Sequence, residues 1–119
     1  MATRELEVAL RWDDGVPVLD LIGDIDAGAE GALQRAWDAA AGDARALILD
    51  FSRTAYINST GIALIVRLLA DARARRIEMT ACGLSDHYRE IFEITRLADF
   101  MRIDTEDGRR DRRGREWHA

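Results

Sequence analysis

The sequence has 119 residues, 48% of them hydrophobic, which is enough to build one ordinary globular domain with its own core. The longest apolar stretch, residues 61–70, is interrupted by Arg67 and is much shorter than the ~20 residues that a membrane-spanning helix needs. Neither a signal peptide nor a membrane span is predicted. We therefore expect a single-domain, cytoplasmic protein without membrane insertion.

Charge and cysteine content exclude several kinds of site. All 17 basic residues are arginine, so lysine-dependent sites, such as a Walker-A loop, a Schiff base or a kinase active site, are excluded. The formal net charge of −5 argues against general affinity for nucleic acid. Cys82 is the single cysteine, and His87 and His118 stand far apart in the sequence. We therefore predict no disulfide, no metal and no cofactor.

The first half of the chain predicts a hairpin, a helix and a strand. Residues 6–10 and 16–22 alternate or run apolar on either side of Asp13-Asp14-Gly15, which is typical of a β-hairpin. After Asp26, apolar residues recur at helical spacing as far as Gly42, which occupies a helix-stop position. Residues 46–51 form a short apolar run that predicts a central, buried strand.

The second half continues the alternation of helices and strands. Residues 52–61 are polar and predict a loop, and a second helix follows with Ile62, Ile65, Val66 and Leu69 on one face. Residues 77–81 predict a strand, Ser85 could cap a third helix, and residues 97–103 predict a helical turn and a short strand. The fold class is therefore α/β, with a mixed sheet of about four to five strands and helices packed against it.

The predicted domain spans residues 1–103, and residues 104–119 form a charged C-terminal tail. The tail contains five arginines and five acidic residues and little that is apolar beyond Trp117, so we expect it to be disordered. Its cluster of arginines at residues 109–113 could contact RNA or a membrane surface. Because acidic residues are interleaved with the arginines, a solvated tail is the preferred interpretation.

Three short motifs follow one another at spacings typical of a known family. LDFS at residues 49–52 and INSTGI at residues 57–62 resemble the phosphorylation loop of the STAS family, the sulfate transporter and anti-sigma factor antagonist domains. LIGDID at residues 21–26 is similar to the GELD-type segment of that family, and ACGLS at residues 81–85 to the stretch that opens its third helix. The resemblance covers roughly residues 8–103 and is to the antagonist type.

The resemblance implies that Ser59, the first hydroxyl residue of the loop, is phosphorylated, with Thr60 as the second candidate. Where the family usually has aspartate, this chain has Asn58, which keeps the turn-forming shape but removes a negative charge beside the hydroxyl. A serine at the start of a helix can accept hydrogen bonds from first-turn amides, and a phosphate there meets the positive end of the helix dipole. The residues implied in partner binding are Asp24, Asp26, Asn58, Ser59, Thr60 and Gly61.

The same residues also have purely structural interpretations. Residues 58–60 could be an ordinary cap and turn, Asp26 could simply cap the first helix, and Asp24 could be a solvated loop residue. Gly23 and Gly61 most simply supply permissive backbone conformations in tight turns.

Three further side chains are predicted to have structural roles only. Trp37 and Cys82 are expected in the core, and Trp12 is expected to border the hairpin turn.

The leading functional hypothesis is a binding module and not an enzyme. The resemblance implies that the unphosphorylated domain captures an anti-sigma factor and so frees a sigma factor. It also implies that this partner is a serine kinase of the histidine-kinase-like ATPase type, and that a PP2C-type phosphatase reverses the modification. The sequence has no Gly-x-Ser-x-Gly elbow and no glycine-rich phosphate loop, which argues against catalysis.

Two alternatives remain within the same family. The chain could be a regulatory subunit of a lipid-transport ATP-binding cassette system, or a scaffold subunit of a stress-signalling complex. A neighbouring kinase and phosphatase gene pair would favour the first hypothesis, and a permease with its ATPase would favour the transporter subunit.

Overall fold

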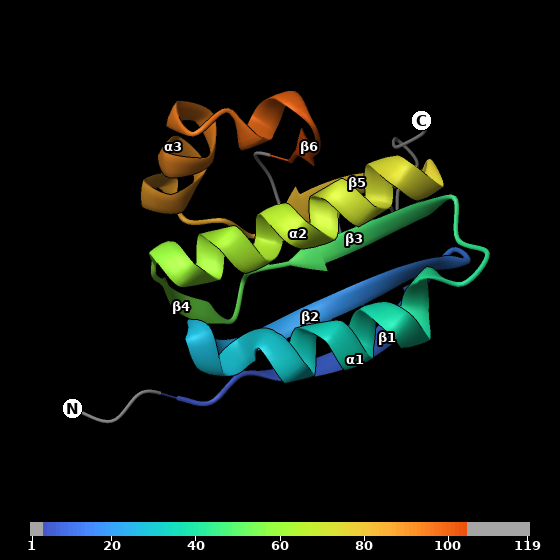
Figure 1. Cartoon of the computed structure of the whole chain (residues 1–119), viewed down its shortest axis with the longest axis horizontal. Coiled ribbons are helices and arrows are strands. Elements are labelled where there is room, and N and C mark those ends of the chain that lie inside the picture. Colours follow the sequence, from blue (N-terminus) through green and yellow to red (C-terminus); the bar gives the residue numbers. More distant parts are fainter. Residues whose placement is uncertain (1–3, 105–119) are drawn as a thin grey trace.

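The computed structural model describes residues 4–104 as one sheet with helices (Figure 1). The strands are β1 (Glu7–Asp13), β2 (Val16–Ile25), β3 (Ala46–Asp50), β4 (Thr54–Ile57), β5 (Glu78–Cys82) and β6 (Arg102–Ile103). The helices are α1 (Glu30–Ala41), α2 (Ser59–Arg75) and α3 (Asp86–Ile94), with short 3₁₀ helices at Ala27–Ala29 and Leu97–Asp99. All of the predicted tail beyond residue 104 lies outside the described residues.

The sheet is mixed, with strand order β1-β2-β3-β5-β6 and with β4 paired to the end of β2. β1 and β2 are the antiparallel arms of the predicted hairpin, with Arg11 opposite Val18. The other pairs are parallel: Val18 lies opposite Ile48 of β3, and Ile48 lies opposite Thr80 of β5. Parallel neighbours need crossover connections, which α1 and α2 supply, so the predicted α/β class with a mixed sheet is confirmed.

Strand β4 corrects the prediction that residues 52–61 form a loop. Thr54 pairs with Gly23 and Ile57 pairs with Ile25, with an irregularity in β2 between Gly23 and Asp24. The Thr54 hydroxyl donates a hydrogen bond to the Leu21 carbonyl at 2.7 Å. The segment contains β-branched and aromatic residues, which favour a strand once a partner strand lies beside them. β2 is also longer than predicted, so Asp24 lies inside the strand and not after it.

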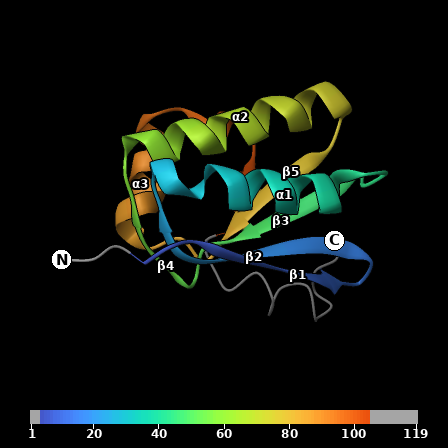
Figure 2. The ribbon, with the colours of Figure 1, turned by 60° about the horizontal axis from the view of Figure 1, so that its bottom comes forward.

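Both long helices cover the same face of the sheet (Figure 2). Trp37 of α1 is fully buried there, as predicted, and its indole N–H donates a hydrogen bond to Asp71 of α2. The strand residues of this core are alternate ones along each strand, because successive side chains point to opposite faces. The core includes Leu19, Leu21, Leu47, Leu49, Met79 and Ala81 from the sheet and Leu33, Ile65, Leu68 and Phe92 from the helices.

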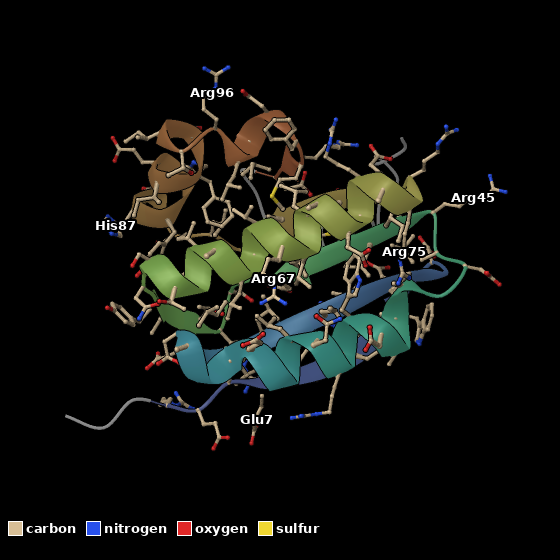
Figure 3. The ribbon with its side chains drawn as sticks, viewed as in Figure 1. Glu7, Arg45, Arg67, Arg75, His87 and Arg96 are labelled. Carbon is tan, nitrogen blue, oxygen red and sulfur yellow. The ribbon has the colours of Figure 1, made fainter. Side chains whose placement is uncertain are left out.

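Helix α2 buries a slightly different stripe from the predicted one. Ile65 and Leu69 are buried, but Val66 is 43% exposed, and the stripe is completed by Leu64, Leu68 and Ala72. Arg67 lies on the exposed side and pairs with Glu30 of α1 at 2.9 Å, in the gap between the two helices (Figure 3). Both side chains of this pair are more than half exposed, so it contributes about 1 kcal/mol at most.

Several smaller predictions are confirmed. The Ser85 hydroxyl accepts a hydrogen bond from the Tyr88 amide and so caps α3. Cys82 is buried, and Trp12 is exposed beside the hairpin turn. In residues 4–104, no helix combines the length and the apolar character that a bilayer crossing requires.

Candidate functional site

The junction between β4 and α2 holds the hydroxyl residues singled out in the sequence. β4 ends at Ile57, Asn58 is the N-cap, and Ser59 is the first residue of α2. The Asn58 side-chain oxygen accepts a hydrogen bond from the Gly61 amide at 2.8 Å. The cap is therefore Asn58 and not Ser59, which corrects the expectation that the serine hydroxyl accepts bonds from the first turn. This arrangement leaves the serine at the first helical position.

Ser59 and Thr60 are both exposed at the N-terminus of α2. The first amides of a helix have no acceptor within the helix, and the helix dipole adds a partial positive charge at the same end. The first turn of α2 carries no acidic residue that would oppose an added anion. A phosphate on the Ser59 oxygen would therefore meet a favourable electrostatic environment.

Gly61 brings the start of α2 against the end of β2. A Cβ atom at this position would collide with the Ile25 carbonyl oxygen, so no side chain fits there. Ile25 also accepts a hydrogen bond from the Asn58 amide at 3.2 Å. The reason for this glycine is close backbone approach and not a tight turn, which corrects that prediction. Because Gly61 is buried, it supports the exposed residues beside it and cannot itself form a contact surface.

Asp24 and Asp26 lie next to this junction, because β2 pairs with β4. Asp24 lies opposite Tyr56, and its carboxylate accepts a hydrogen bond from the Arg4 amide at 3.0 Å. Asp26 accepts a hydrogen bond from the Gly28 amide at 3.0 Å and so caps the 3₁₀ helix that precedes α1. Both are half-buried and have structural roles. The fold thus gathers residues 24–26 and 56–61 at one end of the sheet.

Gly23, in the same part of β2, has a φ of +119°. This backbone conformation favours glycine, as predicted, but Gly23 lies at the irregularity of strand β2 and not in a tight turn, which corrects that part of the prediction.

Two tyrosines at the junction were not predicted as site residues. The Tyr88 hydroxyl of α3 accepts a hydrogen bond from the Ile57 amide at 2.9 Å, which ties α3 to the last residue of β4. Tyr56 is 48% exposed, two residues before Asn58. The alternation in Thr54-Ala55-Tyr56-Ile57 was the sequence signal that could have indicated a strand with one exposed aromatic side chain.

A third acidic residue, Asp50, has a structural role of its own. It is 4% exposed at the end of β3, where it accepts hydrogen bonds from Ser52 and pairs with Arg11 at 3.1 Å. In the part of the chain that the structure describes, no group of three or more His, Cys, Asp or Glu side chains could hold a metal ion.

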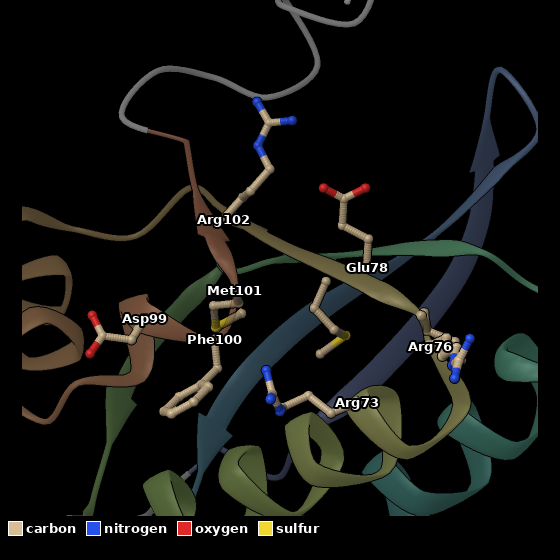
Figure 4. A pocket seen from close by; sticks show the side chains of 9 residues that line it. Arg73, Arg76, Glu78, Asp99, Phe100, Met101 and Arg102 are labelled. Atoms are coloured by element: carbon tan, nitrogen blue, oxygen red, sulfur yellow. The ribbon is translucent and has the colours of Figure 1, made fainter.

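A separate hollow of about 540 Å³ lies at the other end of α2, beside β5 and β6 (Figure 4). Arg73 stacks over the Phe100 ring there, 4.9 Å from its centroid, and Glu78 and Arg102 border the opening. The hollow shares no lining residue with the Ser59 junction. It is therefore not part of the candidate site.

Comparison with known proteins identifies the fold around this junction. The family model of the STAS domain matches residues 7–108. The chain belongs to the STAS domain family. The STAS domain is similar to the anti-sigma-B factor antagonist of Listeria monocytogenes, with 36% identity over 62 residues, which is 52% of this chain and 54% of the relative. The match thus spans about half the length of that relative.

Two solved structures of SpoIIAA share the fold of this STAS domain. The anti-sigma factor antagonist SpoIIAA in its unphosphorylated form superposes with a TM-score of 0.66 at 16% identity, covering 88% of this chain and 92% of SpoIIAA. The phosphorylated form of this Bacillus cell fate determinant gives a TM-score of 0.64 at 21% identity, covering 90% and 97%. At these identities the likeness shows the fold alone.

Proposed function

We propose that this STAS domain is an anti-sigma factor antagonist that is switched by phosphorylation of Ser59. Unphosphorylated, it binds an anti-sigma factor and releases a sigma factor, and phosphorylation ends that binding. The observation that carries the proposal is the exposed Ser59 hydroxyl on the first turn of α2, held by the Asn58 cap. The antagonist relative and the existence of SpoIIAA in two phosphorylation states support it.

The physics of the junction explains how one phosphate could act as a switch without refolding the domain. The helix N-terminus tolerates the anion, so the domain keeps its fold. The added charge of about −1.5 to −2 changes what the surface can contact, because a partner would have to desolvate it or oppose it with acidic groups. The residues proposed to touch the partner are Asp24, Asp26, Asn58, Ser59 and Thr60.

The partners follow from the same proposal. The anti-sigma factor is a serine kinase of the histidine-kinase-like ATPase type, and a PP2C-type phosphatase removes the phosphate. Both meet the domain in the cytoplasm. The domain itself has no catalytic role and presents a hydroxyl as substrate. Thr60 is the alternative acceptor, because it is also exposed and follows one residue later.

The first test is phosphorylation of the full chain, with ATP, by an anti-sigma factor kinase of the histidine-kinase-like ATPase type from the same cells. We expect one added phosphate on the wild type and on Thr60→Ala, and none on Ser59→Ala, by intact mass and peptide mapping. Ser59→Asp should weaken binding to that kinase at least tenfold, because it places a charge at the interface. Loss of the phosphate in Thr60→Ala but not in Ser59→Ala would move the site to Thr60.

The state of the protein in its own cells gives a second readout. We expect a mixture of modified and unmodified chains whose ratio changes between growth and stress. Unmodified protein under both conditions would contradict the switch and favour the transporter-subunit or scaffold alternative.

The departure at Asn58 can be tested in the same assay. Asn58→Asp keeps an oxygen that can cap α2 and restores the charge that the family usually has, so we expect faster phosphorylation at unchanged stability. Asn58→Ala is the matched control, because it removes the cap and should cost about 1 kcal/mol of stability.

A further inference from the structure

One face of the sheet is covered by no helix among residues 4–104. We call it the open face. It carries the alternate strand residues that point away from α1 and α2. Strand pairing places them in rows, one of which runs from Arg11 through Val18, Ile48 and Thr80 to Arg102, across all five strands of the main path. A second row joins Asp20, Asp50 and Cys82.

The centre of the open face is buried although it lacks a helical layer. Val18 is 0% exposed, Ile48 4% and Cys82 1%, and these three form an apolar cluster separate from the main core. The described members of this cluster, together with the adjoining Val16, all come from strands. Side chains on a sheet face without a helical layer are usually in contact with water, so the low exposure of these three residues distinguishes this face from an ordinary solvent-facing one.

The open face is also acidic. The basic side chains on this face are Arg11 and Arg102. The acidic side chains outnumber them and are Glu7, Asp13, Asp20, Asp50 and Glu78. Arg11 is already engaged, since it pairs with Asp20 at 2.7 Å and with Asp50 at 3.1 Å. A hollow of about 150 Å³ lies on this face, bordered by Asp13, Asp14 and Glu78 among others. A segment that complements the open face would carry positive charges and an apolar side chain.

We propose that the C-terminal segment of the chain, residues 105–119, binds across the open face. This segment contains five arginines, four acidic residues and Trp117, and four of the arginines lie at residues 109–113 with one aspartate among them. That arginine cluster matches the excess of carboxylates, and Trp117 matches the apolar centre. It begins at the right place, because β6 pairs with β5 and the Asp104 amide donates a hydrogen bond to the Ala81 carbonyl of β5. The proposal replaces the expectation of a solvated tail and does not depend on phosphorylation of Ser59.

The length of the segment is sufficient. Fifteen residues reach about 50 Å when extended, at roughly 3.3 Å per residue. The four strand spacings from β6 to β1 amount to about 19 Å, at roughly 4.8 Å each. The segment can therefore cross the sheet and still fold back over its centre.

Cys82 provides a direct test, because it lies on the open face and is the single cysteine of the chain. The measurement is the rate at which a maleimide labels Cys82 in the native full chain. We expect slow labelling of the wild type and at least tenfold faster labelling when Arg109, Arg110, Arg112 and Arg113 are all changed to serine together with Trp117→Ala. The matched control, Glu106→Gln with Asp107→Asn, changes the charge of the same segment in the opposite sense and should label as slowly as the wild type.

A second cysteine position separates uncovering of the face from unfolding. In a Cys82→Ala chain, Ala40→Cys places a thiol under the helices, where Ala40 is buried. Its labelling rate should not change with the tail substitutions. Fast labelling of wild-type Cys82, or slow labelling that the tail substitutions leave unchanged, would overturn the proposal. Slow labelling that is lost on dilution would overturn it too, because a second copy of the chain would then be the cover.

Discussion

Gly61 sets the geometry of the candidate site through one backbone contact. The Ile25 carbonyl oxygen occupies the space where any other residue would have its Cβ atom. We predict that Gly61→Ala lowers the free energy of unfolding by about 3 kcal/mol, because the start of α2 must move away from β2. Urea denaturation measures this loss, and the phosphorylation rate of Ser59 should fall with it.

Gly31 is the matched control for this substitution. It lies on the exposed side of α1, and the nearest atom to an added Cβ is the flexible guanidinium of Arg35 at 3.1 Å. Gly31→Ala should raise the free energy of unfolding by about 0.5–1 kcal/mol, because alanine has the higher helix propensity. Equal losses at both glycines would show that close approach at Gly61 is not the cause.

The pairing of elements around Ser59 depends on α3 as well as on β2. The Tyr88 hydroxyl is the acceptor for the Ile57 amide at the last residue of β4. We predict that Tyr88→Phe costs about 1–2 kcal/mol, because a part-buried amide loses its partner. Hydrogen exchange should show faster exchange of the Ile57 amide while the amides of β3 stay protected.

Tyr56→Phe is the matched control for Tyr88→Phe. Its side chain is exposed on β4, so removing its hydroxyl should change stability by less than about 0.5 kcal/mol. If Tyr88→Phe behaved in the same way, and Ile57 exchange were unchanged, α3 would not be a support for the site.

Across the domain, the ionic group of Arg11, Asp20 and Asp50 links three strands on the open face. The hydrogen bond to Asp20 raises the pKa of Arg11 above its ordinary value, against the opposing effect of burial. Arg11→Leu would leave the buried Asp50 carboxylate without its cation. We predict a loss of about 2–3 kcal/mol, measured by urea denaturation.

Arg67→Leu is the comparison for Arg11→Leu. Its partner Glu30 is exposed, so water replaces the lost ion pair and the change should stay within about 1 kcal/mol. Losses of similar size at Arg11 and Arg67 would contradict a structural role for the ionic group.

The sequence by itself determined the class of the fold and most of its elements. Apolar periodicity predicted the hairpin, the three helices and the central strands, because the spacing of apolar residues along the chain indicates which face of each element is buried. The motifs at residues 21–26, 49–62 and 81–85 indicated the STAS family, and the family model that matches residues 7–108 confirms it. The choice of Ser59 as the modified residue stays a prediction that the phosphorylation test must decide.

Only the tertiary structure decided how the site is held together. The signal for β4 in residues 54–57 is short and lies among polar residues, and its strand conformation depends on hydrogen bonding to the end of β2, so the sequence alone predicted a loop. The role of Gly61 depends on the Ile25 carbonyl, which is distant in sequence, and the role of Tyr88 depends on the docking of α3. The same holds for Asp50, whose carboxylate meets Arg11 only when β1, β2 and β3 lie side by side. Local spacing records which face of an element is buried, but contacts between distant backbone and side-chain atoms exist only after the strands have paired.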